Sequence, residues 1–164
     1  FADLEKRTGR KYNLVEQYKV EDADVVVVAL GTTYETAQLV VDNMRAEGIK
    51  AGVVMPRLFR PFPLNEIANV LKNAKAVVCM DRSAPGGATG ALYNEVSGAL
   101  FNTDARPLLS NVIYGLGGRD MTVNILSDIY RYAQEEVNAG KLNGGIQRWV
   151  GVRGPELKYY KVQE

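Results

Sequence analysis

Residues 25–31, VVVVALG, decide the fold of this chain. The valines form a β-branched run without polar alternation, which indicates a strand that is buried on both faces. The final glycine is followed by apolar residues at helical spacing from Ala37 to Met44, and Gly48 provides a stop. The stretch therefore predicts a buried strand, a tight turn and a helix.

The same unit recurs three times along the chain. The apolar runs IKAGVVM (49–55), AVVCM (76–80) and LLSNVIY (108–114) each lead through a different loop into a helical pattern. Strands that alternate with helices form parallel sheets covered by those helices, so the pattern predicts an α/β fold. We expect a single domain with an open, mainly parallel sheet and helices on both faces.

The expected domain occupies residues 1–140, and residues 1–24 form its polar lead-in segment. Residues 141–164 are punctuated by glycine and show no sustained period, which indicates a C-terminal arm. The arm contains Trp149 and Tyr159, and such aromatic residues are favoured at interfaces. We therefore expect the arm to pack either on its own domain or on a partner.

The composition excludes several classes of protein. With 20 Lys and Arg against 19 Asp and Glu, the chain has no broad basic field, so we expect neither nucleic acid nor a membrane as a partner. The chain has no histidine and a single cysteine, Cys79, which cannot assemble a zinc site or an iron–sulfur cluster. One cysteine also excludes an internal disulfide and fits a cytoplasmic location.

Four loops are expected to meet at one edge of the sheet. In a parallel sheet with helical crossovers, every loop that follows a strand emerges at the carboxyl edge, where ligands usually bind. Arginines beside backbone amides at helix starts favour an anion there. The candidates for contacts with an anion or another domain are Arg60, Asp81, Arg82, Gly86, Gly87, Gly118, Arg119 and Asp120.

The glycine-rich loop DRSAPGGATGALYNEV (81–96) allows two interpretations, a phosphate site or a structural turn. A P-loop has a lysine and a hydroxyl residue after its last glycine, whereas Gly90 is followed by Ala91. The first predicted strand is followed by GTTYET, which lacks the glycines of a dinucleotide fingerprint. We therefore favour the turn. For Asp81 and Asp120, capping of a helix or turn explains the residues at least as well as a chemical role does.

The residues show no catalytic constellation. There is no compelling carboxylate pair, activated lysine or nucleophile elbow, so we expect no catalytic residue and no metal ligand in this chain. The sequence does not identify cofactor-binding residues.

The motifs VEDADVVVVALGTT, MPRLFRPFP, MDRSAPGGATG and YGLGGRDMT occur in this order between about Gly9 and Val137. Together they resemble the alpha-chain segment of the 2-oxoacid:ferredoxin oxidoreductase family, most closely of pyruvate:ferredoxin oxidoreductase, or pyruvate synthase. The resemblance implies a domain similar to the C-terminal domain of transketolase.

The resemblance also implies what the complete enzyme does. Such an enzyme oxidatively decarboxylates pyruvate with coenzyme A, yields acetyl-coenzyme A and reduces ferredoxin. It uses thiamine diphosphate, magnesium and iron–sulfur clusters, none of which the resemblance assigns to residues of this chain. Pyruvate and a related 2-oxoacid both stay open as the substrate.

Two functions are compatible with these observations. The first is a supporting and assembly domain whose partners are other domains or subunits of the same oxidoreductase. The alternative is a freestanding anion- or nucleotide-binding module that uses the arginine-rich carboxyl edge. The missing phosphate motif favours the first, and we expect Arg60, Arg82, Arg119 and Asp120 to form an interdomain network.

Overall fold

The valine run forms β2 (Val25–Val28), which lies in the middle of the sheet. β2 pairs in parallel with β3 (Ala51–Pro56) on one side and with β4 (Ala76–Asp81) on the other. Its side chains are all buried, because both faces of the sheet are covered at this strand. The computed structural model describes residues 1–152 of the chain. The strand predicted from the valines is therefore confirmed, and it is the centre of the fold.

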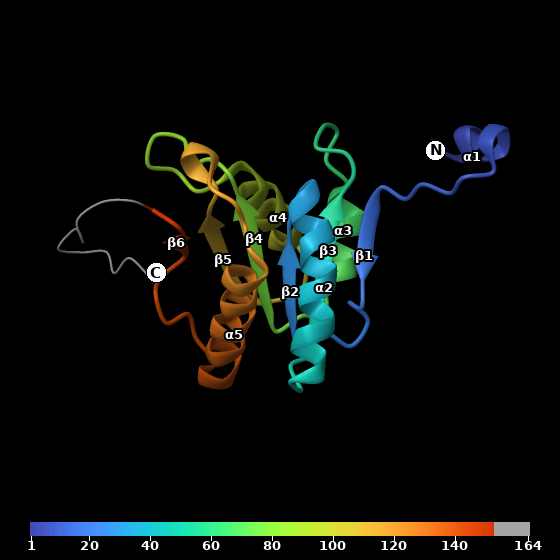
Figure 1. The fold of residues 1–164 in the computed structure, drawn as a ribbon. Coiled ribbons are helices and arrows are strands. Elements are labelled where there is room, and N and C mark those ends of the chain that lie inside the picture. The colour runs from blue at the N-terminus through green and yellow to red at the C-terminus, as the bar shows by residue number, and fades with distance from the viewer. Residues whose placement is uncertain (153–164) are drawn as a thin grey trace.

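Six strands form one sheet within residues 1–152, in the order β1-β3-β2-β4-β5-β6 (Figure 1). β5 (Leu108–Ile113) pairs in parallel with β4, and β6 (Gln147–Trp149) pairs in parallel with β5. At the opposite edge, β1 (Val15–Tyr18) pairs antiparallel with β3. The prediction of an open, mainly parallel sheet is confirmed.

Helices cover both faces of this sheet, as the sequence predicts. α2 (Thr32–Ala46) and α5 (Val123–Ala139) pack against each other on one face. α3 (Leu64–Leu71) and α4 (Ala91–Phe101) pack together on the other face. None of the helices in the described part of the chain is long and apolar enough to span a membrane.

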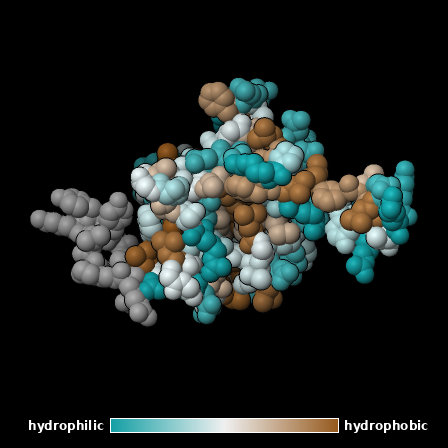
Figure 2. All heavy atoms as spheres, turned by 90° about the horizontal axis from the view of Figure 1, so that it is seen from above, coloured by the Kyte–Doolittle hydropathy of each residue, from teal (hydrophilic) through white to brown (hydrophobic). Residues whose placement is uncertain are grey.

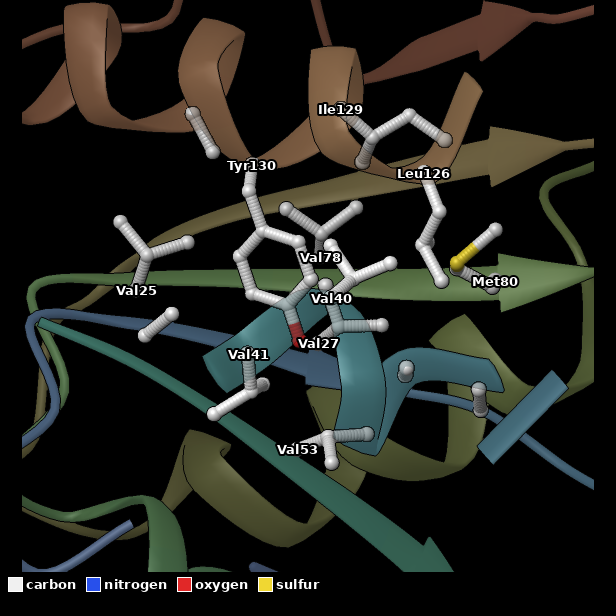
Figure 3. Packing of buried hydrophobic residues seen from close by; sticks show 14 of the residues in the cluster. Val25, Val27, Val40, Val41, Val53, Val78, Met80, Leu126, Ile129 and Tyr130 are labelled. Carbon is white, nitrogen blue, oxygen red and sulfur yellow. The ribbon is translucent and has the colours of Figure 1, made fainter. Parts of the chain in front are cut away.

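The sheet separates two hydrophobic cores. Val25 and Val27 point into the core beneath α2 and α5, and the other two valines of β2 point into the core beneath α3 and α4. In the first core Tyr130 is fully buried among valines, and its hydroxyl donates to the carbonyl of Gly52 at 2.9 Å (Figure 3). Full burial of a valine side chain contributes about 1.5–3 kcal/mol to the stability of the folded state. The valines of β2 therefore stabilise the cores on both faces of the sheet.

The lead-in segment contains two elements that the sequence did not predict. α1 (Ala2–Thr8) buries none of its residues and projects from the body of the molecule (Figures 1 and 2). β1 is only four residues long, with the partly polar sequence VEQY. A short edge strand gives little periodic signal, which explains why this pattern did not indicate a strand.

The C-terminal region begins where α5 ends at Gly140, whose φ of 67° is the left-handed conformation typical of a residue that ends a helix. Residues 147–149 then add β6 to the sheet, which the sequence also did not predict. The division at residue 140 stays a prediction. Tyr159 lies outside the described residues.

Candidate functional site

The loops after β2, β3, β4 and β5 emerge together at the carboxyl edge of the sheet (Figure 1). Figure 2 looks down on this edge and shows hydrophilic and hydrophobic residues interspersed over it. Residues 57–63 and 82–90 form two of these loops, and a third contains the short 3-10 turn η1 (Leu116–Gly118). The sequence-derived candidates lie on or directly beside these three loops.

Asp81 is the most deeply buried of the candidates, with 6% of its surface exposed. Its carboxylate accepts hydrogen bonds from the backbone N–H groups of Leu92 at 2.8 Å and Tyr93 at 3.2 Å. These groups belong to the first turn of α4, whose N-cap position is a glycine without a side chain. Asp81 therefore caps α4 from the end of β4, as one of its two predicted roles requires.

Asn111 of β5 completes the site around Asp81, and sequence reasoning missed it. Its side-chain amide donates to Asp81 Oδ2 at 2.8 Å and to the Cys79 carbonyl at 3.1 Å, and its Oδ1 accepts from the Gly90 N–H at 2.8 Å. Asn111 is completely buried. An asparagine inside the apolar run LLSNVIY was the available signal, because a buried amide needs partners.

This network closes the base of the glycine-rich loop. Asp81 precedes the loop and Gly90 ends it, and a side chain at Gly90 would bring a Cβ to 2.2 Å from the Asp81 carboxylate. At the tip, Gly86 and Gly87 have φ values of 54° and 87°, which favour glycine. The loop is therefore a turn with a fixed base.

β6 also holds the glycine-rich loop. The side-chain amide of Gln147 donates to the Ala88 carbonyl at 3.2 Å and to Asn111 Oδ1 at 3.3 Å. The C-terminal region thus reaches the loop through one side chain. Nothing in the sequence pattern indicated this contact.

The next residue, Arg148, anchors β6 to α5. Its guanidinium pairs with Glu136 at 3.1 Å, donates to Ser110 Oγ at 3.3 Å and lies 4.1 Å from the centre of the Tyr132 ring. Glu136 is 1% exposed and also accepts from the Asn143 N–H at 2.9 Å. A buried carboxylate with two donors is satisfied, so this pair fixes the position of β6.

Arg60 lies apart from the other candidates. It pairs with Glu95 of α4 at 2.8 Å, and its guanidinium stacks 4.6 Å from the centre of the Phe59 ring. Phe59 in turn meets Phe62 edge-on, with ring centres 5.9 Å apart. The loop 57–63 therefore presents an arginine and two packed aromatic rings.

Arg82 and Asp120 are brought together at a small cavity of about 220 Å³. Arg82 donates weakly to the carbonyl of Arg119, at 3.5 Å, so these three candidates are neighbours. Gly118 precedes them with a φ of 79°, which favours glycine in this turn. Of the four charged residues expected in one network, Arg60 thus lies on the α4 side, Arg82 and Asp120 line the cavity, and Arg119 is next to them through its carbonyl.

Cys79 and Tyr93, which lie near Asp81, are both poor candidates for a nucleophile. Burial raises the pKa of the Cys79 thiol well above its usual range, and the nearby Asp81 adds to the effect. Burial also raises the pKa of Tyr93. Both groups therefore stay protonated at neutral pH, when they are poor nucleophiles.

The side chains of this chain cannot hold the iron–sulfur clusters that the family resemblance implies for the complete enzyme. Iron–sulfur clusters need several cysteine thiolates, and the whole chain has one cysteine. Among residues 1–152 there is also no cluster of three or more His, Cys, Asp or Glu side chains that could hold a metal ion.

Residues 23–126 match the family described as pyruvate:ferredoxin oxidoreductase core domain II. The chain is 39% identical over 158 residues to pyruvate synthase subunit PorA of Pyrococcus furiosus, which covers 96% of this chain and 40% of that protein. It is 38% identical over 143 residues to ketoisovalerate oxidoreductase subunit VorA of Pyrococcus horikoshii, covering 87% of this chain and 36% of that protein. The chain thus spans about two fifths of the length of these relatives.

Among solved structures, a split-gene transketolase, described as an inactive tetramer of its beta chain, has a similar fold. The TM-score is 0.55 at 22% identity, over 73% of this chain and 41% of that chain. This likeness confirms the predicted transketolase-like architecture.

Proposed function

The chain belongs to the pyruvate:ferredoxin oxidoreductase core domain II family, and we propose that it is a supporting and assembly domain of a larger 2-oxoacid:ferredoxin oxidoreductase. The observation that carries the proposal is the match to PorA over 96% of this chain but only 40% of PorA. A chain that aligns almost completely with part of a longer subunit is best explained as one of its domains. This favours an assembly domain over a freestanding anion-binding module.

In this proposal the redox chemistry takes place elsewhere in the enzyme. The complete protein decarboxylates a 2-oxoacid with coenzyme A and passes electrons to ferredoxin, with thiamine diphosphate, magnesium and iron–sulfur clusters held by other domains or subunits. A cytoplasmic location accompanies it, because a chain with one cysteine forms no internal disulfide.

Pyruvate is the proposed substrate, in line with the PorA relative. Ketoisovalerate is the competing substrate, because the VorA relative has nearly the same identity to this chain. Ferredoxin reduction by the purified complete enzyme, measured with each acid at equal concentrations, distinguishes them. A higher kcat/KM with ketoisovalerate would reject pyruvate.

The proposed contact surface is the carboxyl edge, and its projecting loops 57–63 and 82–90 are the parts best placed to reach another domain (Figure 1). Arg60 keeps most of its side chain exposed while it pairs with Glu95, so a neighbouring carboxylate can still reach it. Gly86 and Gly87 allow close approach of a partner's backbone at the loop tip. Arg119 contributes from the third loop.

A charge reversal at this surface tests the assembly role. Arg60→Glu in the full-length protein is expected to reduce recovery of the assembled enzyme and its 2-oxoacid-dependent ferredoxin reduction, because like charges then meet across the contact. The matched control is Arg131→Glu, which changes an exposed arginine that pairs with Glu47 near the end of α2. Equal assembly and activity in the two variants would refute the contact surface.

A further inference from the structure

The cavity at Arg82 lies at a special place in the sheet. β2 and β4 are neighbours, yet the chain leaves β2 for α2 on one face and leaves β4 for α4 on the other face. In open α/β sheets such a reversal forms the crevice in which ligands bind. The cavity is lined by hydroxyl and charged side chains, chiefly Thr32, Thr33, Thr36, Arg82, Tyr114 and Asp120.

The guanidinium of Arg82 is held in place without a carboxylate partner. It lies 5.6 Å from the centre of the Tyr114 ring, and it occupies space that a side chain at position 115 would need, since a Cβ on Gly115 would come within 2.7 Å of it. Arg57 and Arg60 at the same edge each pair with a glutamate. Within residues 1–152 Arg82 forms no ion pair, so its fork of donors is available to an anion.

A buried pair of hydroxyls adds a further donor. Thr33 Oγ1 and the Tyr114 hydroxyl lie 2.7 Å apart, and both residues are at least nine-tenths buried. Each hydroxyl has one proton, and a single hydrogen bond between them uses only one of the two. The second proton has no partner among the described residues, although a buried donor normally has one.

We propose that this cavity binds a phosphoryl group, as free phosphate or as a phosphate ester. The fork of Arg82 binds two of its oxygens, and the hydroxyl pair of Thr33 and Tyr114 donates to a third. The exposed Thr32 offers a further hydroxyl on the α2 side of the cavity, whereas the hydroxyl of Thr36 already donates to the Thr32 carbonyl at 3.2 Å. Several donors arranged around one small space suit a tetrahedral anion with oxygens in several directions.

Asp120 limits which phosphate compounds fit. Its carboxylate lines the same cavity and is an acceptor only, so it repels a fully ionised phosphate. It accepts a hydrogen bond from a ligand hydroxyl, such as one on the sugar of a phosphate ester. The charge balance of the cavity therefore favours a ligand that carries both a phosphoryl group and a hydroxyl.

Isothermal titration of the full-length protein at constant ionic strength tests this site. The probes are inorganic phosphate, ribose 5-phosphate and AMP, each titrated into the natural sequence and into Arg82→Gln. Loss of charge-assisted hydrogen bonds is expected to weaken binding by about 10- to 100-fold in this variant. Arg57→Gln is the matched control, because it removes an equal charge from an arginine that pairs with Glu16.

Hydrogen–deuterium exchange locates the binding, since a complete enzyme of this family has other anion sites. Phosphate is expected to protect peptides covering residues 30–36 and 114–121 in the natural sequence and not in Arg82→Gln. Unchanged affinity and protection in Arg82→Gln, or no saturable binding of any probe, would overturn the proposal. Assembly measured on the same samples reports separately on the proposed function.

Asp120→Asn distinguishes the two sources of the phosphoryl group. Removing the negative charge is expected to raise the affinity for inorganic phosphate severalfold, whether the ligand is free phosphate or a phosphate ester. If the ligand is an ester, ribose 5-phosphate and AMP bind the natural sequence more tightly than phosphate does, and Asp120→Asn reduces this advantage. Equal affinity for the three probes assigns the site to free phosphate, and an unchanged affinity for phosphate in Asp120→Asn would contradict the placement of the ligand.

Discussion

The loops 57–63 and 82–90 both follow buried strands at the carboxyl edge, yet they are held in opposite ways. The proline-rich loop 57–63 is held by ion pairs at the surface, Arg57 with Glu16 and Arg60 with Glu95. The base of the glycine-rich loop is held by a buried carboxylate and a buried amide.

Loop composition is therefore a poor guide to how firmly a loop is held. Glycine allows many backbone conformations, but hydrogen bonds from Asn111 to Asp81 and from Gly90 to Asn111 hold the two ends of the second loop together. Buried donors that lose their acceptor destabilise a protein, whereas exposed ion pairs contribute little. Changes in the second loop should therefore cost much more than changes in the first.

The largest effect is expected from Asp81→Ala. The change leaves two N–H groups of α4 and the Asn111 amide without their acceptor, which should lower the free energy of unfolding by about 3–5 kcal/mol. Chemical denaturation measures this loss. Asp81→Asn is the matched control, since it keeps one acceptor oxygen and should cost less; an Asp81→Ala protein within about 1 kcal/mol of the natural sequence would refute the role of the network.

Gly90→Ala should have the next largest effect. The new Cβ would lie 2.2 Å from the Asp81 carboxylate, and relief of this clash should cost about 2–3 kcal/mol. The control is Gly98→Ala in the middle of α4, where a Cβ meets nothing within 4 Å. There alanine should stabilise the helix by up to about 1 kcal/mol, so denaturation midpoints that move in the same direction for both variants would contradict the comparison.

A smaller effect is expected from Glu16→Gln in β1. The change removes the ion pair with Arg57, whose two side chains are both partly exposed. The loss should be about 0.5–1 kcal/mol and should diminish in high salt. Denaturation at low and high ionic strength checks both points, and a salt-independent loss would mean that packing rather than charge holds this end of the loop.

The smallest effect on stability is expected from Arg60→Gln. The Arg60 side chain is 64% exposed, so losing its pair with Glu95 should change the free energy of unfolding by less than about 0.5 kcal/mol. Assembly of the full-length enzyme should suffer more than stability does if Arg60 contacts another domain. A large loss of stability would instead assign Arg60 to the loop's own structure.

Much of the fold could be predicted because its strands are buried on both faces. Apolar runs such as VVVVALG and AVVCM leave no alternative to central strands, and the helices between them show a clear periodicity. β1 and β6 escaped prediction because edge strands of four and three residues have polar side chains and take their place from their neighbours. The sheet order likewise follows from tertiary pairing rather than from local sequence.

The site was predictable only in part. The resemblance and the loop arginines directed attention to the carboxyl edge, and Asp81 proved to cap α4. Asn111 and Gln147 were missed because each acts on a residue more than twenty positions away in the sequence. The separation of Arg60 from Arg82 also depends on how the loops fold back, which sequence spacing does not encode.

Gln147 and Arg148 determine how a pulling force on β6 is passed to the rest of the domain. Gln147 touches the glycine-rich loop, while Arg148 is clamped to Glu136 on α5. A load applied at Val152 would first meet the pairing of β6 with β5, including the Val150 N–H that donates to the Ile113 carbonyl at 2.9 Å, and then the ion pair of Arg148 with Glu136, before it reached Gln147. Tension at this end of the described chain would therefore be shared between β5 and α5 before it acted on Gln147 and the glycine-rich loop.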